Sequence, residues 1–521
     1  MGVFFSDKLQ RILFIVILLI TIIFLLYPKY LPMTDLPQHI ALVVSFDDFL
    51  KDKGVWSSML WINWDTNYIL LYLYWLLLYQ ILPILWATKI VVISIFLLYI
   101  YAIRSLRRTF QADRMLDLVG LTCFFGYSFQ YGFISFILGI AFGLLFLALN
   151  KRYLDNPNKK DWWLILLTGV LTYYSHLLAF AFFCMTAYAY FIFSSIKIFS
   201  WQQRIKFTVP YLVFALLLLH YLTMPNPVPS TWWYDGETAW SVDKSFNITL
   251  WQIKKIQLFY LPLDMNYLND FLEIFVQLLL LSPFFIASIT KKKTYYIIFI
   301  LALITYFIMP RKWMDSFYLY HRFAWIVIIF YFLLWRKNNK KLQGYRLNIS
   351  KIASVFFIIA IFSLLCKVYI NHISFAHSLS IRDMEIIEQQ MQAEKRVLYL
   401  FEHYYNPYGE NISPNNFYEH LASYYQAKKH GWRDKNFASE VAIPVRFTKE
   451  ANYSKDFREN TQLSPDALRH KLDCTPYDYL IIRSSFNAKT LNTLFKDNPR
   501  CVNMQVIVET KSLILLGKNE Q

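Results

Sequence analysis

Long runs of apolar residues recur along the first part of the chain, from residue 11 to residue 370. Each run is about 17 to 20 residues long, the length that an α-helix needs to cross the hydrocarbon core of a bilayer. Short polar segments that carry Lys and Arg separate most of these runs. The pattern predicts a mainly α polytopic membrane protein, with about eleven transmembrane helices in a transmembrane domain over residues 1–370.

The basic segments orient these helices, because short Lys- and Arg-rich segments stay on the cytoplasmic side of a membrane. This rule places the amino terminus in the cytoplasm and two long loops, residues 31–85 and 224–266, outside it. The apolar stretch 67–82 is expected to lie along the membrane surface, since a span there would move the arginines that follow residue 103 to the outer side. The expected spans are 12–30, 86–103, 115–130, 132–150, 162–175, 178–196, 208–223, 267–289, 294–309, 318–335 and 352–370.

After residue 370 the chain becomes polar and contains no further run long enough to span. We predict a soluble α/β domain over residues 371–521, joined to the last span by a linker at 372–384. An odd number of spans places this domain outside the cytoplasm. Short segments predict its strands and a helix: strands at 396–401, 479–483 and 506–516, and a helix at 416–430. The domain holds Cys474 and Cys501, and the sequence leaves open whether they form a disulfide.

Composition agrees with a membrane protein. The chain is 57% hydrophobic and only 17% charged, whereas soluble proteins carry about 25% charged residues. The net charge of +17 comes from the first 370 residues, because residues 371–521 hold 19 Lys and Arg against 18 Asp and Glu. Since most of the excess lies in short loops between apolar runs, it sets topology, and no nucleic-acid partner is predicted.

One carboxylate follows the first span directly. Asp35 lies between Pro32 and Pro37, which restrict the backbone on both sides of it. A general base must be held in place within reach of a hydroxyl, so Asp35 is the candidate catalytic residue. The alternative is that Asp35 only caps the helix that begins there. His39, one helical turn further on, is expected either to orient Asp35 or to contact substrate, or else to be a structural histidine at the interface.

Four further residues are candidates for binding an anionic lipid head group near the outer membrane surface. Lys89 opens the second span, His176 lies at an outer turn, and His321 and Arg322 lie at the start of the tenth span. Arg322 is the strongest, because an Arg within an apolar segment is costly unless it is paired or faces a cavity. For Arg322 and Lys89 the alternative is a side chain that only reaches to the interface.

This arrangement resembles the glycosyltransferase C (GT-C) superfamily, the multi-span enzymes that use sugars linked to polyprenyl phosphate. The likeness consists of a first helix, an outer loop with Asp35 near its start, an interfacial apolar stretch, a second helix opening with Ala87-Thr88-Lys89, and a carboxy-terminal outer domain. Segments of the chain also look like a little-described set of bacterial membrane proteins placed beside that superfamily: TDLPQHIA, YGFISFILG, SHLLAF, HRFAW and YDYLIIR.

The resemblance implies an inverting glycosyltransferase of the plasma (inner) membrane. Its partners would be membrane lipid, a polyprenyl-phosphate sugar and a glycan, lipid or protein acceptor. Asp35 would act as base, and Arg322, with Lys89 or His321, would stabilise the lipid phosphate. No cofactor is predicted: members often carry an acidic pair that can hold a divalent metal, but here Leu36 follows Asp35. The alternatives are a transporter or flippase for a lipid or envelope precursor, and a non-catalytic scaffold of the same fold.

Overall fold

The structure is a computed structural model of the chain of 521 residues. It describes residues 7–194, 198–223, 248–260, 276, 278–313, 316–337, 345–402, 407–408, 415–434, 436–439, 443–448 and 463–518. The described part is mostly helical, with a mixed sheet near the carboxyl end, so the predicted mainly helical class is confirmed.

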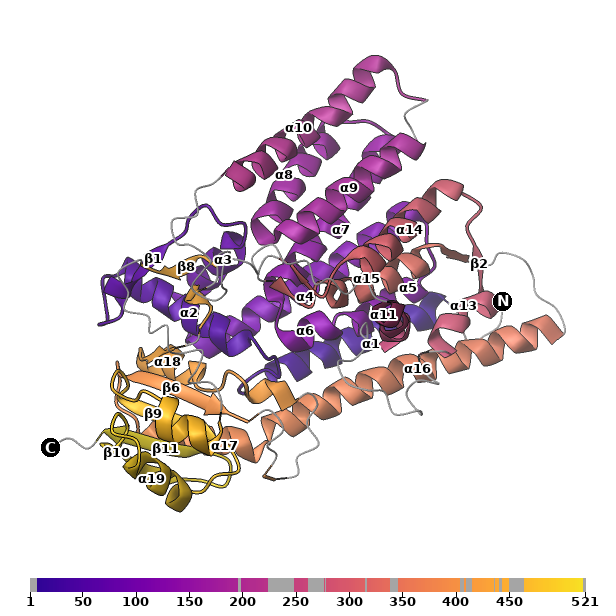
Figure 1. The fold of residues 1–521 in the computed structure, drawn as a ribbon. Helices are drawn as coiled ribbons and strands as arrows, with labels where there is room; N and C mark the ends of the chain where they lie inside the picture. Colours follow the sequence, from indigo (N-terminus) through magenta and orange to yellow (C-terminus); the bar gives the residue numbers. More distant parts are fainter. Residues whose placement is uncertain are drawn as a thin grey trace.

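The membrane part is built from helices that follow the apolar runs (Figure 1). They are α1 (Asp7–Leu26), α2 (Leu36–Leu50), α3 (Ile69–Tyr79), α4 (Ile84–Phe110), α5 (Met115–Cys123), α6 (Tyr127–Tyr131), α7 (Ile134–Asp155), α8 (Lys159–Ser175), α9 (Leu177–Ser194), α10 (Trp201–Thr223), α11 (Ile248–Tyr260), α13 (Pro283–Ile286), α14 (Lys293–Ile308), α15 (Leu319–Leu333) and α16 (Tyr345–Ala376).

Six helices of the described residues are long and apolar enough to cross a membrane. They are α1, α4, α7, α9, α10 and the segment Asn348–Gln390, which covers most of α16 and the helix that follows it. Many large apolar side chains of α1 and α10 are exposed, as expected for surfaces that face lipid. Helix α3 has 11 residues and rises about 16 Å, so it is too short to cross a hydrocarbon core of about 30 Å. Its length agrees with the interfacial position predicted for residues 67–82.

Three sequence predictions about the helices need correction. The expected span 115–130 is interrupted between α5 and α6, where Gly126 adopts an extended backbone. The expected linker 372–384 is mostly helical, because Phe375, Ile381 and Met384 are buried in the core instead of crossing solvent. The expected span 267–289 ends in a strand, β2 (Ala287–Ile289), and its residues 267–275 and 277 lie outside the described residues.

The predicted outer loop 224–266 contains a helix, α11. Its residues 224–247 and 261–266 lie outside the described residues.

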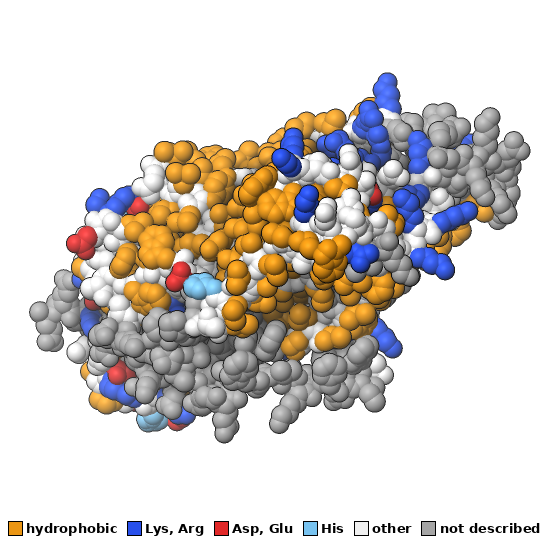
Figure 2. Space-filling view, turned by 90° about the horizontal axis from the view of Figure 1, so that it is seen from above, with side chains coloured by type: hydrophobic (Ala, Val, Ile, Leu, Met, Phe, Trp, Pro, Cys, Tyr) orange, Lys and Arg blue, Asp and Glu red, His pale blue; other side chains and the backbone are white. Residues whose placement is uncertain are grey.

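Basic residues from distant loops gather at one end of the helices. Lys151 and Arg336 both lie over the ring of Tyr295, at 5.9 and 5.1 Å from its centroid. The backbone N–H of Asp113 donates to the carbonyl of Trp335, which joins the end of α4 to the end of α15. Figure 2 shows a broad hydrophobic band across one face of the molecule, with Lys and Arg collected at one end of it. The loops predicted to share one side of the membrane therefore meet in space.

The carboxy-terminal sheet lies at the opposite end, and α16 runs along the molecule from the basic end to this sheet (Figure 1). Its strand order is β10-β11-β9-β6-β7. Strand β6 pairs in parallel with both neighbours, whereas β9, β11 and β10 pair antiparallel. The strands are β6 (Arg396–Phe401), β7 (Trp432–Arg433), β9 (Tyr479–Arg483), β10 (Met504–Glu509) and β11 (Ile514–Lys518), with helices α17 (Leu379–Gln390), α18 (Ser423–Lys429) and α19 (Ala488–Lys496).

Alternating residues of the sheet serve two cores, as the period of two in a strand requires. Val397 and Tyr399 belong to the large core that continues into the membrane part, and Leu398 and Leu400 belong to a separate small core. That small core also contains Cys474 and Cys501, which form a disulfide. The disulfide that the sequence left open is therefore present.

The sheet region is attached to the first outer loop. Strand β1 (Leu60–Ile62) pairs antiparallel with β8 (Val445–Phe447), and α18 packs against α2. The Nε2 group of Gln426 donates to the hydroxyl of Ser45 at 3.0 Å in the buried interface. Because backbone pairing and buried contacts join them, residues 36–62 and the carboxy-terminal sheet lie on the same side of the molecule.

One of these contacts predicts a pH dependence. His430, at the end of α18, places Nδ1 2.8 Å from a carboxylate oxygen of Asp48, at the end of α2. The hydrogen bond to Asp48 raises the pKa of His430 above its ordinary value of 6.5. A raised pKa means that this contact stabilises fully below pH 6.5 and that the contribution is lost as the pH rises through the raised pKa.

The measurement compares the Tm of wild type and His430→Gln between about pH 6 and pH 9. We expect wild type to melt at the higher temperature at acidic pH, and the difference to shrink as the pH rises. A difference that stays constant over this range would show that the charge of His430 does not contribute.

Candidate functional site

Asp35 stands at the amino-terminal end of α2, so the helix that the capping alternative expected does begin there. Its backbone N–H donates to the carbonyl of Tyr131 at 2.9 Å, and that of Thr34 donates to Gln130 at 3.0 Å. These bonds hold the segment against the turn after α6. Although Asp35 occupies the N-cap position, its side chain makes no capping hydrogen bond to α2. The carboxylate therefore faces groups other than its own helix.

Gly132 permits this close approach. It has a φ of +88°, and a Cβ placed on it would lie 3.0 Å from the backbone nitrogen of Leu36 and 3.1 Å from that of Asp35. Only glycine adopts this conformation readily and leaves that space free. The position of Asp35 thus depends on a residue almost a hundred positions later in the chain.

Gly132→Ala is expected to destabilise the protein and to displace Asp35. The positive φ alone costs an Ala about 1–2 kcal/mol, and the contact with Leu36 adds to this cost. Gly54→Ala is a matched control, because Gly54 has a φ of +79° but its added Cβ would meet nothing closer than 3.9 Å. The Tm should fall further in Gly132→Ala than in Gly54→Ala. Equal effects of the two substitutions would contradict this account.

A histidine from the carboxy-terminal part lies beside Asp35. The Nε2 atom of His420 is 3.5 Å from Oδ1 of Asp35, and both side chains are mostly buried. Arg433 approaches the other ring nitrogen, with its Nη1 3.1 Å from Nδ1 of His420. A guanidinium can only donate, so Nδ1 accepts and Nε2 carries the proton. This tautomer directs an N–H group of His420 towards Asp35.

Arg433 is itself fixed by the elements around it. Its Nη1 donates to the hydroxyl of Ser423 at 2.9 Å, and its backbone N–H donates to Oε1 of Gln426 at 3.3 Å. Gln38, on the first turn of α2, donates from its amide nitrogen to Nδ1 of His420 at 2.9 Å. Asp35, His420 and Arg433 therefore form a buried polar chain that joins the membrane part to the carboxy-terminal sheet.

An aromatic layer lies on the membrane side of Asp35. The ring of Tyr131 stacks with Tyr127 at 5.0 Å and with Phe133 at 5.1 Å, and it lies 4.7 Å from Tyr318. The ring of Tyr127 is 4.8 Å from that of His321. This layer connects the turn that holds Asp35 to the start of α15.

Cations follow directly behind this layer. The guanidinium carbon of Arg322 lies 3.7 Å from the ring centroid of Phe133, and its Nη1 lies 3.4 Å from Nε2 of His176. His176 in turn lies 3.0 Å from the hydroxyl of Tyr68. Two predicted residues, Arg322 and His176, are thus in direct contact. The stacked rings of Phe133 and Tyr131 connect Arg322 to the segment at Asp35.

Two further basic residues, Lys254 and Arg311, add to this group. The guanidinium of Arg311 lies 5.5 Å from the ring of Tyr318. The ammonium of Lys254 lies 4.7 Å from the ring of Tyr320 and donates to the carbonyl of Met309 at 2.7 Å. The rings of Tyr318 and Tyr320 lie 5.3 and 3.9 Å from that of His321, so both cations lie near His321, the neighbour of Arg322. The arrangement can therefore stabilise an anion next to the aromatic layer.

The other two predicted residues lie elsewhere. The Nδ1 atom of His39 is 2.7 Å from the hydroxyl of Tyr72, and burial lowers the pKa of His39 to about 4. Its ring faces Tyr72 and Phe437, and its backbone N–H donates to the carbonyl of Asp35. Lys89 donates to the carbonyl of Leu26 at 2.7 Å and lines a separate cavity.

Sequence reasoning missed His420, Arg433, Lys254 and Arg311. His420 and Arg433 lie in the carboxy-terminal part without a motif around them, and only the packing of α18 on α2 brings them to Asp35. Lys254 belongs to α11, a helix that was expected to be a loop.

Within the described residues, no three His, Cys, Asp or Glu side chains gather closely enough to hold a metal ion. Compared with known proteins, the chain matches no protein-family model and no curated protein.

Proposed function

We propose that this chain is an integral membrane glycosyltransferase of the GT-C type, which moves a sugar from polyprenyl phosphate to an acceptor of the cell envelope with inversion. The observation that carries the proposal is the Asp35 carboxylate, fixed by the turn at Tyr131 and Gly132 and flanked by His420. A group of cations lies behind one aromatic layer from it. A base and an anion site on the two sides of one aromatic layer suit a reaction in which a hydroxyl attacks while a phosphate leaves.

In the proposed reaction, the acceptor hydroxyl gives its proton to Asp35 as its oxygen attacks the anomeric carbon of the donor sugar. The bond between that carbon and the lipid phosphate oxygen breaks, and polyprenyl phosphate leaves with one more negative charge. Arg322 stabilises this charge as it develops, which is the kind of interaction that lowers a barrier rather than only strengthening binding.

His420 is a positioning residue in this scheme. We expect its Nε2–H group, 3.5 Å from Oδ1 of Asp35, to orient the carboxylate, and Arg433 favours the tautomer that can do so. Because both come from the carboxy-terminal part, the catalytic group is completed only when that part docks on α2.

The proposal includes a topology of about eleven spans, with the basic end in the cytoplasm and residues 371–521 as a soluble domain outside it. Two observations support this placement. The basic loops gather at the end opposite the carboxy-terminal sheet. The Cys474–Cys501 disulfide also suits an oxidising compartment, where such bonds persist.

The proposal is tested with purified protein in liposomes, given polyprenyl-phosphate donors labelled in the sugar and an envelope extract as acceptor. We expect the label to enter the acceptor fraction while one polyprenyl phosphate is released for each sugar transferred. Movement of intact labelled donor across the bilayer, without release of polyprenyl phosphate, would instead identify a flippase. Absence of both with a broad donor panel and folded protein would leave the scaffold alternative.

A further inference from the structure

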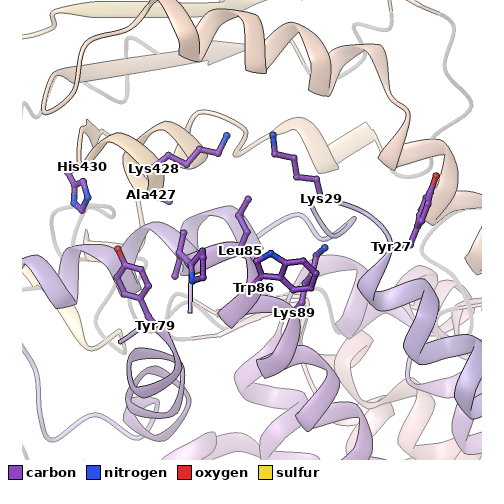
Figure 3. Close-up of a pocket in the computed structure, with 11 residues that line it drawn as sticks. Tyr27, Lys29, Tyr79, Leu85, Trp86, Lys89, Ala427, Lys428 and His430 are labelled. Carbon is purple, nitrogen blue, oxygen red and sulfur yellow. The ribbon is translucent and has the colours of Figure 1, made fainter. Parts of the chain in front are cut away.

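A second cavity lies where α1, α4 and α18 meet, away from Asp35. It has a volume of about 710 Å³, and its lining includes Lys29, Trp86, Lys89 and Lys428. Figure 3 shows Lys29 and Lys428 along one side of it, and Trp86 with Lys89 along the other. Because α1 ends and α4 begins here, the cavity opens at the boundary of the membrane part.

The charges that line this cavity do not balance. Lys29 forms an ion pair with Glu385, and Lys428 forms one with Glu388. Lys89 is 7% exposed, and its ammonium group contacts the carbonyl of Leu26 at 2.7 Å and the ring of Trp86 at 4.6 Å. Among the residues that the structure describes, no carboxylate pairs with Lys89. One buried positive charge is therefore left over, and such a charge is costly unless an anion meets it.

The remaining lining is apolar. Pro83, Ile84 and Leu85 form part of the wall, and the large side chains at the rim, Tyr27 and Trp86, are 54% and 51% exposed. Tyrosine and tryptophan exposed where a span begins are typical of the head-group level of a bilayer. The wall can therefore contact acyl chains while Lys89 contacts a head group.

We propose that this cavity binds one phospholipid of the surrounding bilayer that carries a net negative charge, with its phosphodiester on Lys89. A phosphodiester carries one negative charge, which matches the one unbalanced ammonium, and the apolar wall suits its acyl chains. Since α18 supplies Lys428 and Ala427 to the lining, the bound lipid joins the carboxy-terminal part to the membrane spans. This inference does not depend on the proposed transferase activity.

The test measures the Tm of the full-length protein in detergent while phosphatidylglycerol or phosphatidylcholine is added. We expect phosphatidylglycerol to raise the Tm of wild type and phosphatidylcholine to have little effect. Lys89→Gln should need about tenfold more phosphatidylglycerol for the same rise, and Lys89→Arg, which keeps the charge, should respond like wild type. Lys53→Gln is the matched control, because Lys53 is exposed in the first outer loop.

Three outcomes would overturn the proposal. An equal rise with both lipids would show that charge is not recognised, and an unchanged response of Lys89→Gln would place the lipid elsewhere. Glycerol phosphate, which has no acyl chains, should not reproduce the effect; if it does, the cavity is a site for soluble phosphate. Native mass spectrometry tests the same question without a variant. Wild type is exchanged into equal amounts of the two lipids, and we expect it to retain phosphatidylglycerol in preference to phosphatidylcholine.

Discussion

Replacement of Asp35 by Asn is expected to lower the turnover of sugar transfer by about 10²- to 10⁴-fold, the usual contribution of a general base. Asn keeps the shape of the side chain and can still accept the N–H of His420, but it cannot take a proton from the acceptor hydroxyl. Binding of the lipid-linked donor should change little, because the donor phosphate meets the cations behind the aromatic layer. The experiment measures the turnover and the donor affinity of wild type and of Asp35→Asn, at equal amounts of folded protein.

Asp52→Asn is the matched control for this substitution. Asp52 is exposed and has a φ of +49°, a conformation that Asn tolerates well. The substitution Asp52→Asn makes the same chemical change in the same expected outer loop, but outside the candidate site. Turnover in Asp35→Asn equal to that of Asp52→Asn would remove Asp35 from the mechanism.

Arg322→Gln is expected to lower turnover by about 10²- to 10³-fold, as removal of one donor to a developing oxyanion does. The donor phosphodiester already carries one charge, so its affinity should also fall, but by less than turnover falls. The buried guanidinium lies against Phe133 and His176, so Gln leaves both rings in place while removing the charge. Lys should restore little of the activity, because it lacks the planar guanidinium that stacks on Phe133.

The control is Arg336→Gln, which removes an arginine at the opposite end of the same helical hairpin. Arg336 donates to the carbonyls of Leu333 and Trp335, beyond the carboxyl end of α15, whereas Arg322 lies in the first turn of that helix. It should affect expression or orientation more than turnover. A fall in donor affinity as large as the fall in turnover of Arg322→Gln would show that Arg322 only binds the substrate.

The sequence predicts those parts of the fold that local pattern determines. Uninterrupted apolar runs gave α4 and α7, and short apolar segments gave strands β6 and β9 with the bounds expected for them. The segment 506–516 was expected to be one strand but contains parts of two, β10 and β11, because a tight turn at residues 510–513 joins them. Helix α16 continues past its expected end because burial of Phe375 extends it.

For the same reason, the sequence identified only part of the candidate site. Asp35 could be recognised because its prolines and the preceding span are neighbours in sequence. The contact of Arg322 with His176, and the approach of His420 to Asp35, join residues 146 and 385 positions apart. Such contacts depend on how α15 packs on the turn before α9 and how the carboxy-terminal part docks on α2, which no local pattern encodes.

The anomeric configuration of the product tests the central claim most directly. A single displacement assisted by Asp35 must invert the anomeric carbon, because the hydroxyl attacks from the side opposite the leaving phosphate. We therefore predict, by NMR of the glycosylated acceptor, an anomeric configuration opposite to that of the donor sugar. A product with the donor's configuration, or donor consumption without a glycosidic product, would contradict the mechanism.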